Sequence, residues 1–173
     1  MAYEFYVTVE GTKQGRFKGE SDRQEHADKL AGLSFHYSVG VPRDPASGMP
    51  TGRRTHQPVA FVKEWGAATP QFQQAMITNE SLKSVLFEFV KTSSKSGEEY
   101  VFHRVKLGTA MITEIQQYID PVSGQGQAGD TGPLEKISFT FQRIEIENID
   151  GQTTVVDEVR PQRSPSADPS GQD

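Results

Sequence analysis

The segment that decides the fold class runs from Leu82 to Ile119 and reads LKSVLFEFVKTSSKSGEEYVFHRVKLGTAMITEIQQYI. It is dense in β-branched and aromatic residues, which favour strands. The pattern predicts strands over Leu82–Thr92, Glu99–Leu107 and Thr109–Ile119, and the polar residues 93–98 between the first two are typical of a turn. Short connections place successive strands side by side, so this segment predicts an antiparallel meander.

The residues before this meander show the same alternation of apolar and polar side chains. The first such stretch is Tyr3–Val9, and Gly11 ends it. A second strand is predicted over Leu30–Val41, with Leu33, Phe35, Tyr37 and Val39 on its apolar side and polar residues on the other. A third is predicted over Gln57–Trp65, where the proline near the start indicates an edge or first-residue position.

The residues after the meander predict one long strand and a final hairpin. The strand covers Leu134–Asn148, and its apolar phase slips between Phe141 and Ile144, which predicts a β-bulge there. The dipeptide Asp150–Gly151 is a strong signal for a tight turn, so the chain is expected to return through Thr153–Val159.

One short helix is predicted after the third strand. Thr69 can cap it, and Pro70 suits the first helical position because its missing N–H is not needed there. Phe72, Ala75 and Met76 then follow at the helical spacing i, i+3, i+4. The stripe lasts about two turns, so the helix is expected to pack on a sheet.

These patterns predict an all-β, mainly antiparallel barrel or sandwich with one short flanking α-helix. The chain has 173 residues, the size of one ordinary domain. We therefore expect one β-barrel domain over residues 1–159. Residues 160–173 are polar and rich in proline and serine, and they are expected to form a disordered tail.

The composition excludes several kinds of chemistry. The chain has no cysteine, so disulfides, thiol nucleophiles and cysteine-bound metals are excluded. Its net charge of −5 argues against a nucleic-acid partner. No apolar run is long enough for a membrane span, and the first residues lack the pattern of a signal peptide. We therefore expect a cytoplasmic chain without membrane insertion, which leaves the cell, if it does, without an N-terminal leader.

No motif predicts a catalytic, cofactor or metal site. Residues 124–129 match the letters of a dinucleotide fingerprint, but a strand follows them where that fingerprint needs a helix. The four histidines lack short metal-ligand spacing, and His56 is interpreted as a surface contact. Paired carboxylates such as Asp157–Glu158 are interpreted as solvated charge. We expect no enzymatic activity and no cofactor.

The stretch from Val41 to Thr55 is interpreted as a long protruding loop, because it holds three prolines, two glycines and three arginines. Its arginines, Arg43, Arg53 and Arg54, are expected to pair with acidic groups of a neighbouring subunit or with water.

Three segments together resemble the haemolysin co-regulated protein (Hcp) family. They are the opening strand Phe5–Gly11 with residues 18–21, residues 56–63 running into residues 68–75, and the strand Glu99–Leu107. The resemblance spans about Tyr3 to Val159. The order of strand, loop, strand and helix around residues 56–75 is its most specific part.

The resemblance implies a tube subunit of the bacterial type VI secretion system. The subunit would form hexameric rings that stack into a hollow tube, which carries effectors and is propelled from the cell. Spike and sheath proteins and secreted effectors are the implied partners, besides further copies of the chain. The loop after the second strand would reach adjacent subunits or the next ring, which makes its residues the expected subunit contacts: Val41, Arg43, Asp44, Arg53, Arg54 and His56.

The alternative from another class is a monomeric barrel that binds a small ligand. Such a barrel would have a closed, apolar interior, and the mass in solution distinguishes one chain from six.

Overall fold

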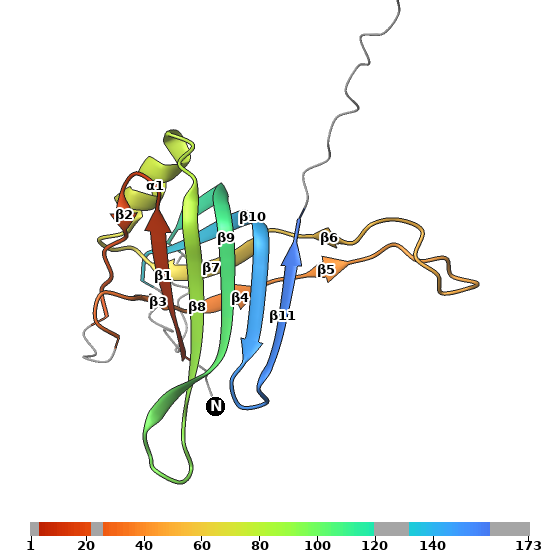
Figure 1. The fold of residues 1–173 in the computed structure, drawn as a ribbon. Coiled ribbons are helices and arrows are strands. Elements are labelled where there is room, and N and C mark those ends of the chain that lie inside the picture. Colours follow the sequence, from red (N-terminus) through yellow and green to blue (C-terminus); the bar gives the residue numbers. More distant parts are fainter. Residues whose placement is uncertain (1–3, 22–25, 120–131, 160–173) are drawn as a thin grey trace, which may run out of the picture.

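A computed structural model of the chain describes residues 4–21, 26–119 and 132–159, and these ranges hold eleven strands and one α-helix (Figure 1). The expected tail, residues 160–173, and the glycine-rich residues 124–129 lie outside the described residues. The elements are β1 (Glu4–Gly11), β2 (Gly15–Arg16), β3 (Leu30–Gly32), β4 (Ser34–His36), β5 (Val39–Gly40), β6 (Thr55–His56), β7 (Val59–Glu64), α1 (Thr69–Ile77), β8 (Leu82–Thr92), β9 (Glu99–Tyr118), β10 (Leu134–Asn148) and β11 (Thr153–Glu158).

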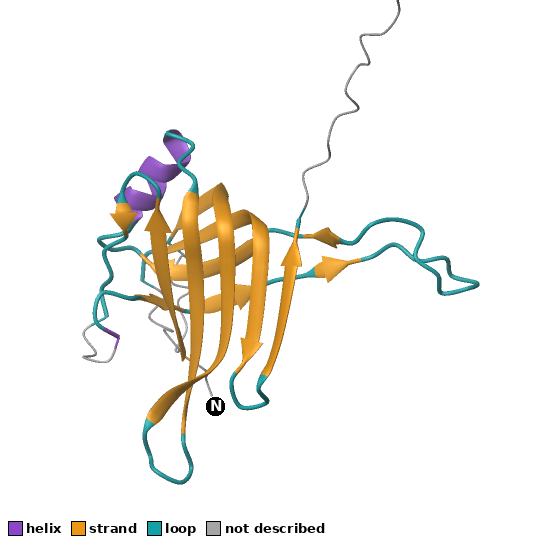
Figure 2. Cartoon of the chain, viewed as in Figure 1, coloured by secondary structure: helices purple, strands orange, loops and turns teal. Residues whose placement is uncertain are grey.

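Most strands belong to one antiparallel sheet in the order β2-β1-β8-β9-β10-β7-β4. The long strand β10 has different outer neighbours along its length. Its first half pairs with β7 and its second half with β11. Figure 2 shows the long strands side by side with α1 at one end. The predicted fold class, mainly antiparallel β-structure with one short helix, is confirmed.

The sheet closes into a barrel through residues 30–36. Strand β3 pairs with β1, and β4, which follows after Leu33, pairs with β7. The backbone N–H of Leu33 donates to the Val62 carbonyl at 2.8 Å, which continues the contact with β7. Gly32 lies opposite Phe5, and a Cβ atom on Gly32 would come within 2.0 Å of the Phe5 ring. The barrel therefore closes over a glycine because the Phe5 ring occupies the space of a side chain.

Phenylalanine rings fill the interior of the barrel. Phe61 and Phe139 stack with ring centroids 5.9 Å apart, and Phe61 meets Phe87 edge-on at 5.6 Å. Helix α1 contributes the buried side chains Phe72 and Ala75 to the same cluster. Burial of these apolar surfaces supplies the main stabilising free energy of the domain.

A buried ion pair joins β7, β10 and the start of α1. The Lys63 ammonium lies 2.7 Å from the Glu135 carboxylate, and the two side chains are 3% and 0% exposed. The Thr69 hydroxyl donates to the same carboxylate at 2.8 Å, and Lys63 also donates to the Glu64 carbonyl at 2.7 Å. Both charges are thus partnered, as buried charges must be to avoid a large desolvation cost.

The predicted strand over Leu30–Val41 is wrong as a single element. The structure divides it into β3, β4 and β5, and Leu33 is 57% exposed although the alternation placed it inside. The reason is the change of partner from β1 to β7, which interrupts the side-chain phase. The predicted break at Gly108 is also wrong, because β9 continues through it, with Thr109 at a φ of 49°.

The bulge is not at its predicted place. From Thr140 to Asn148 the register of β10 against β9 is constant, and the shift lies between Ser138 and Phe139. Phe141 and Ile144 are nonetheless both buried. The change of phase between them occurs where Thr109 of β9 has its positive φ, so it arises without an extra residue in β10.

The predicted helix is confirmed, but its cap is not. Helix α1 begins at Thr69, and the cap residue is Ala68, which makes no side-chain capping bond. Thr69 uses its hydroxyl elsewhere: it accepts the Gly66 N–H and donates to Glu135. Met76 is 36% exposed, so the buried face of the helix consists of Phe72 and Ala75 and is shorter than the spacing predicted.

The close contact at Gly32 predicts the result of adding one methyl group. Gly32→Ala places a Cβ in the space of the Phe5 ring and is expected to lower the free energy of unfolding by about 1–3 kcal/mol, the usual cost of overpacking. Urea unfolding followed by the fluorescence of Trp65, the single tryptophan, measures it. Gly40→Ala is the matched control, since nothing lies within 4 Å of its Cβ position. Equal midpoints for the two variants would contradict the role assigned to this contact.

Candidate functional site

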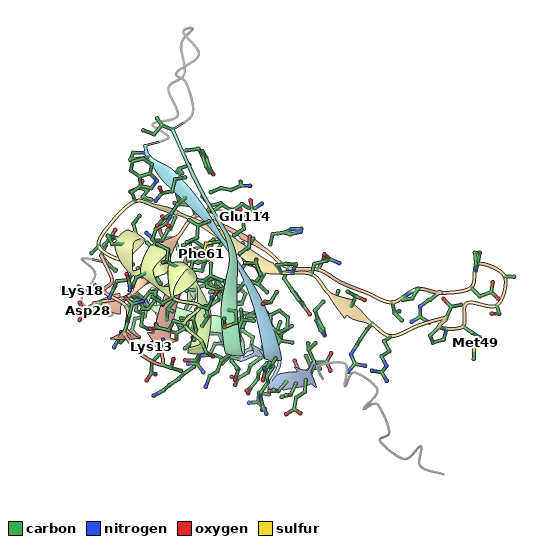
Figure 3. The ribbon with its side chains drawn as sticks, turned by 90° about the horizontal axis from the view of Figure 1, so that it is seen from above. Lys13, Lys18, Asp28, Met49, Phe61 and Glu114 are labelled. Carbon is green, nitrogen blue, oxygen red and sulfur yellow. The ribbon has the colours of Figure 1, made fainter. Side chains whose placement is uncertain are left out.

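The expected protruding loop is an ordered two-stranded ribbon. Strands β5 and β6 pair with each other, and an isolated bridge joins Arg43 to Pro50 further out. The Thr51 N–H also donates to the Pro42 carbonyl at 2.9 Å. We call residues 39–56 the hairpin. Figure 3 shows it extending away from the barrel with Met49 at its tip.

Asp44 and Ser47 organise the tip of the hairpin. The Asp44 carboxylate accepts the Ala46 N–H at 3.0 Å and the Ser47 hydroxyl at 2.9 Å. These two hydrogen bonds, the Ala46 bond foremost, hold the pKa of Asp44 below its usual value. Arg43 donates to the Gly48 carbonyl at 3.0 Å, and Gly48 has the positive φ that a glycine adopts without strain. The tip is therefore shaped by its own side chains.

The neck of the hairpin is tied to the C-terminal strand of the barrel. Asp157 of β11 accepts a hydrogen bond from the Arg54 Nε at 2.5 Å and a second from the Arg54 Nη2 on its other oxygen. His56 Nε2 lies 2.7 Å from the same carboxylate. The Tyr37 hydroxyl lies 2.7 Å from His56 Nδ1. We call Tyr37, Arg54, His56 and Asp157 the neck network.

Aromatic packing encloses the centre of the neck network. The rings of Tyr37 and His56 stack with centroids 6.0 Å apart, and Phe141 meets His56 edge-on at 5.4 Å. The His56 side chain is only 9% exposed. The interpretation of His56 as a surface contact is therefore wrong, because the barrel wall and Tyr37 cover it.

The hydrogen bonds and burial in the neck network shift the pKa values of Asp157 and Tyr37. The hydrogen bond from Arg54, and then that from His56, hold the pKa of the Asp157 carboxyl well below its usual value. Burial, and then the negative charge of Asp157, raise the pKa of the Tyr37 hydroxyl. Both shifts favour the forms that the network uses, an ionised carboxylate and a neutral phenol.

The interpretation of Asp157–Glu158 as a solvated pair is wrong for its first member. Asp157 anchors the hairpin, whereas Glu158 is 65% exposed and lies 3.5 Å from Arg143. About a hundred residues separate Asp157 from its partners, so no local pattern points to the contact. The one available signal was the predicted hairpin that returns β11 alongside β10.

The structure brings four of the six expected contact residues to one groove and leaves two further out. Val41, Arg53, Arg54 and His56 line a groove between the hairpin and the end of β11, together with Asp157 and Val159. Arg43 and Asp44 belong to the outer part of the hairpin. The sequence thus placed all six on one segment but did not show the groove.

No metal site emerges within the described residues. They contain no group of three or more histidine, aspartate or glutamate side chains suited to hold a metal ion. No helix in the described part of the chain is long and apolar enough to cross a membrane.

Comparison with known proteins identifies the family. A sequence model of the family described as "Type VI secretion system effector, Hcp" matches residues 6–147. The "Major exported protein" of Pseudomonas aeruginosa is 33% identical over 153 residues, which cover 83% of this chain and 88% of that protein. The chain therefore belongs to the Hcp family.

Solved Hcp structures share the fold. One described as "Crystal structure of Hcp protein" has a TM-score of 0.84 at 27% identity and covers 92% of this chain and 99% of its own. Secreted protein Hcp3 from Pseudomonas aeruginosa has a TM-score of 0.74 at 24% identity and covers 92% of this chain and 100% of its own. The Hcp barrel is thus the fold of this chain, and the chain is a subunit of the type VI secretion tube.

The lowered pKa of Asp157 predicts an acid-dependent stability difference. Because the folded pKa lies below the unfolded one, the ionised carboxylate stabilises the fold fully above the unfolded value of about 4, and the contribution falls as the pH drops toward the folded pKa. Asp157→Asn removes this contribution.

Urea unfolding of both proteins, followed at Trp65 between pH 7 and pH 2, measures the difference. The wild-type chain is expected to be more stable at pH 7, and the gap is expected to narrow below about pH 4. A gap of constant size over this range would contradict the assigned contacts.

Proposed function

We propose that this Hcp subunit forms a hexameric ring and that the hairpin joins it to neighbouring subunits, either around the ring or in the next ring of the tube. The observation that carries this proposal is the hairpin itself. Every residue from 45 to 54 is exposed, and the ribbon extends away from its own barrel (Figure 1). An ordered segment that buries so little within its own chain is suited to bury itself against another copy.

A second exposed feature lies on β11. Val155 and Val156 are 57% and 44% exposed, and within the described residues β11 pairs only with β10. A ring that closes head to tail needs two different complementary surfaces on each subunit. We propose that the hairpin and the free edge of β11 are these two surfaces.

The remaining parts of the proposal concern partners and location. The tube carries effectors in its lumen and meets the spike and sheath proteins of the apparatus. It assembles in the bacterial cytoplasm and is then exported. The protein is architectural, with no catalytic role and no cofactor.

The monomeric ligand-binding barrel is not favoured. Family membership points to a tube subunit. The barrel interior is also filled by packed side chains, among them Phe61, Phe87 and Phe139, each at most 1% exposed.

The mass of the purified protein in solution tests the ring. Light scattering is expected to give six times the chain mass of 19.2 kDa, and electron micrographs are expected to show rings. A chain that ends at Val159 serves as the control and is expected to give six times its own, smaller chain mass, since the hairpin and β11 lie within residues 1–159. A single-chain mass at high protein concentration would refute the ring.

Shortening the hairpin tests its role in assembly. Replacing residues 43–52 with a short Gly-Ser turn keeps Arg54 and His56 at the neck but removes the exposed ribbon. The barrel is expected to keep its circular dichroism spectrum, while rings or stacks are weakened. Unchanged particle size in sedimentation would contradict the proposed contact.

A further inference from the structure

The direction in which the hairpin leaves the barrel is weakly defined by its backbone. Strands β5 and β6 form a two-stranded sheet of their own, separate from the barrel sheet. The ribbon continues outward from β4 and β7, and the Gln57 N–H donates to the Ser38 carbonyl at 2.9 Å. Isolated two-stranded ribbons are marginally stable and bend easily. Main-chain pairing alone therefore leaves the angle of the hairpin open.

The neck network crosses this point of weakness. Tyr37 precedes β5, Arg54 and His56 lie on the returning side, and Asp157 comes from β11, which is part of the barrel sheet. The network connects both sides of the ribbon to a barrel strand that is distant in sequence. It is placed where a side-chain brace constrains the angle most.

With a neutral His56 ring, the donors and acceptors of the network are complementary. An ionised Asp157 accepts only, so His56 Nε2 must carry the proton that it donates. In the neutral imidazole Nδ1 is then an acceptor, and the Tyr37 hydroxyl donates to it. Arg54 fills both carboxylate oxygens with the side-by-side geometry typical of strong guanidinium pairs. Each of the four side chains is thus joined to another member of the network by at least one hydrogen bond.

We propose that the neck network is a positioning device that sets the angle of the hairpin relative to the barrel before assembly. Its consequence for assembly rests on the proposed function of the hairpin as a contact between subunits. Tyr37, His56 and Asp157 thus act through the hairpin and need not touch a neighbouring subunit.

The angle can be measured directly with spin labels, because the chain has no cysteine that would take up a label elsewhere. Met49→Cys places one label at the hairpin tip, and Lys83→Cys places the other on β8, where the lysine side chain is 60% exposed. The labelled chain is mixed with an excess of unlabelled chain, so that pulsed electron resonance reports only distances within one subunit.

Two variants weaken the neck network to different extents, and one variant controls for them. Asp157→Ala removes the anchor, and Tyr37→Phe removes a single hydroxyl and keeps the packed ring. Glu158→Ala removes the same type of charge one residue further along β11 and leaves the network intact. The parent chain and Glu158→Ala are expected to share one narrow distance distribution, whereas Asp157→Ala and Tyr37→Phe are expected to broaden it.

Unfolding followed at Trp65 separates a moved hairpin from a damaged barrel. If Asp157→Ala fails to fold, Tyr37→Phe decides the question alone. Unchanged distributions in the folded variants would overturn the positioning role, and so would equal broadening in Glu158→Ala.

Assembly gives an independent readout. Variants with a broadened distribution are expected to form fewer rings or stacks at a given protein concentration than Glu158→Ala does. Broadened distributions with unchanged assembly would leave the positioning device standing and refute the proposed role of the hairpin. The two proposals therefore fail on different measurements.

Discussion

Closure of the barrel through residues 30–36 is the constraint on which the rest of the structure depends. One short segment pairs with β1 through its first half and with β7 through its second half. The transfer needs Gly32 at the point where the Phe5 ring crosses the backbone. Because closed sheets leave no unpaired edges in their walls, this segment decides which strands remain free to meet another chain.

The free edges that closure leaves are the parts proposed to contact other subunits. Residues 30–36 lead directly into the hairpin, so the barrel contact and the protruding ribbon share one stretch of chain. Strand β10 pairs with β7 through its first half only, and its second half pairs with β11. The neck network connects these two features, since Asp157 comes from β11 and its partners Arg54 and His56 come from the hairpin.

Sequence patterns predicted the elements whose signals are local. Three signals each depend on residues that are close together in the sequence: the alternation in the meander, the helical spacing from Phe72 to Ala75 and the Asp150–Gly151 turn. The structure has all three elements. The errors occurred where a distant partner decides the outcome. Leu33 is exposed because the strand changes its partner from β1 to β7.

The candidate site shows the same division. Its protruding loop over Val41–Thr55 was predicted from composition, because prolines, glycines and arginines without apolar residues cannot form a core. The composition did not predict that this segment is an ordered ribbon. Its order comes from main-chain pairing between Arg43 and Pro50 and from the turn around Asp44. Asp157 was missed because a single aspartate beside a glutamate on an edge strand looks like ordinary solvated charge.

The neck network also has an energetic consequence for a tube. Association costs free energy when a flexible segment must be ordered at the interface, and a segment held in its bound direction beforehand reduces that cost. In a symmetric assembly the same segment is ordered once in every subunit, so a small saving is repeated around each ring. A brace that packs His56 between Tyr37 and Phe141, with Arg54 and Asp157 at its rim, supplies this order within the single chain. The exposed ribbon then keeps its whole surface available for the proposed contact with a neighbouring copy.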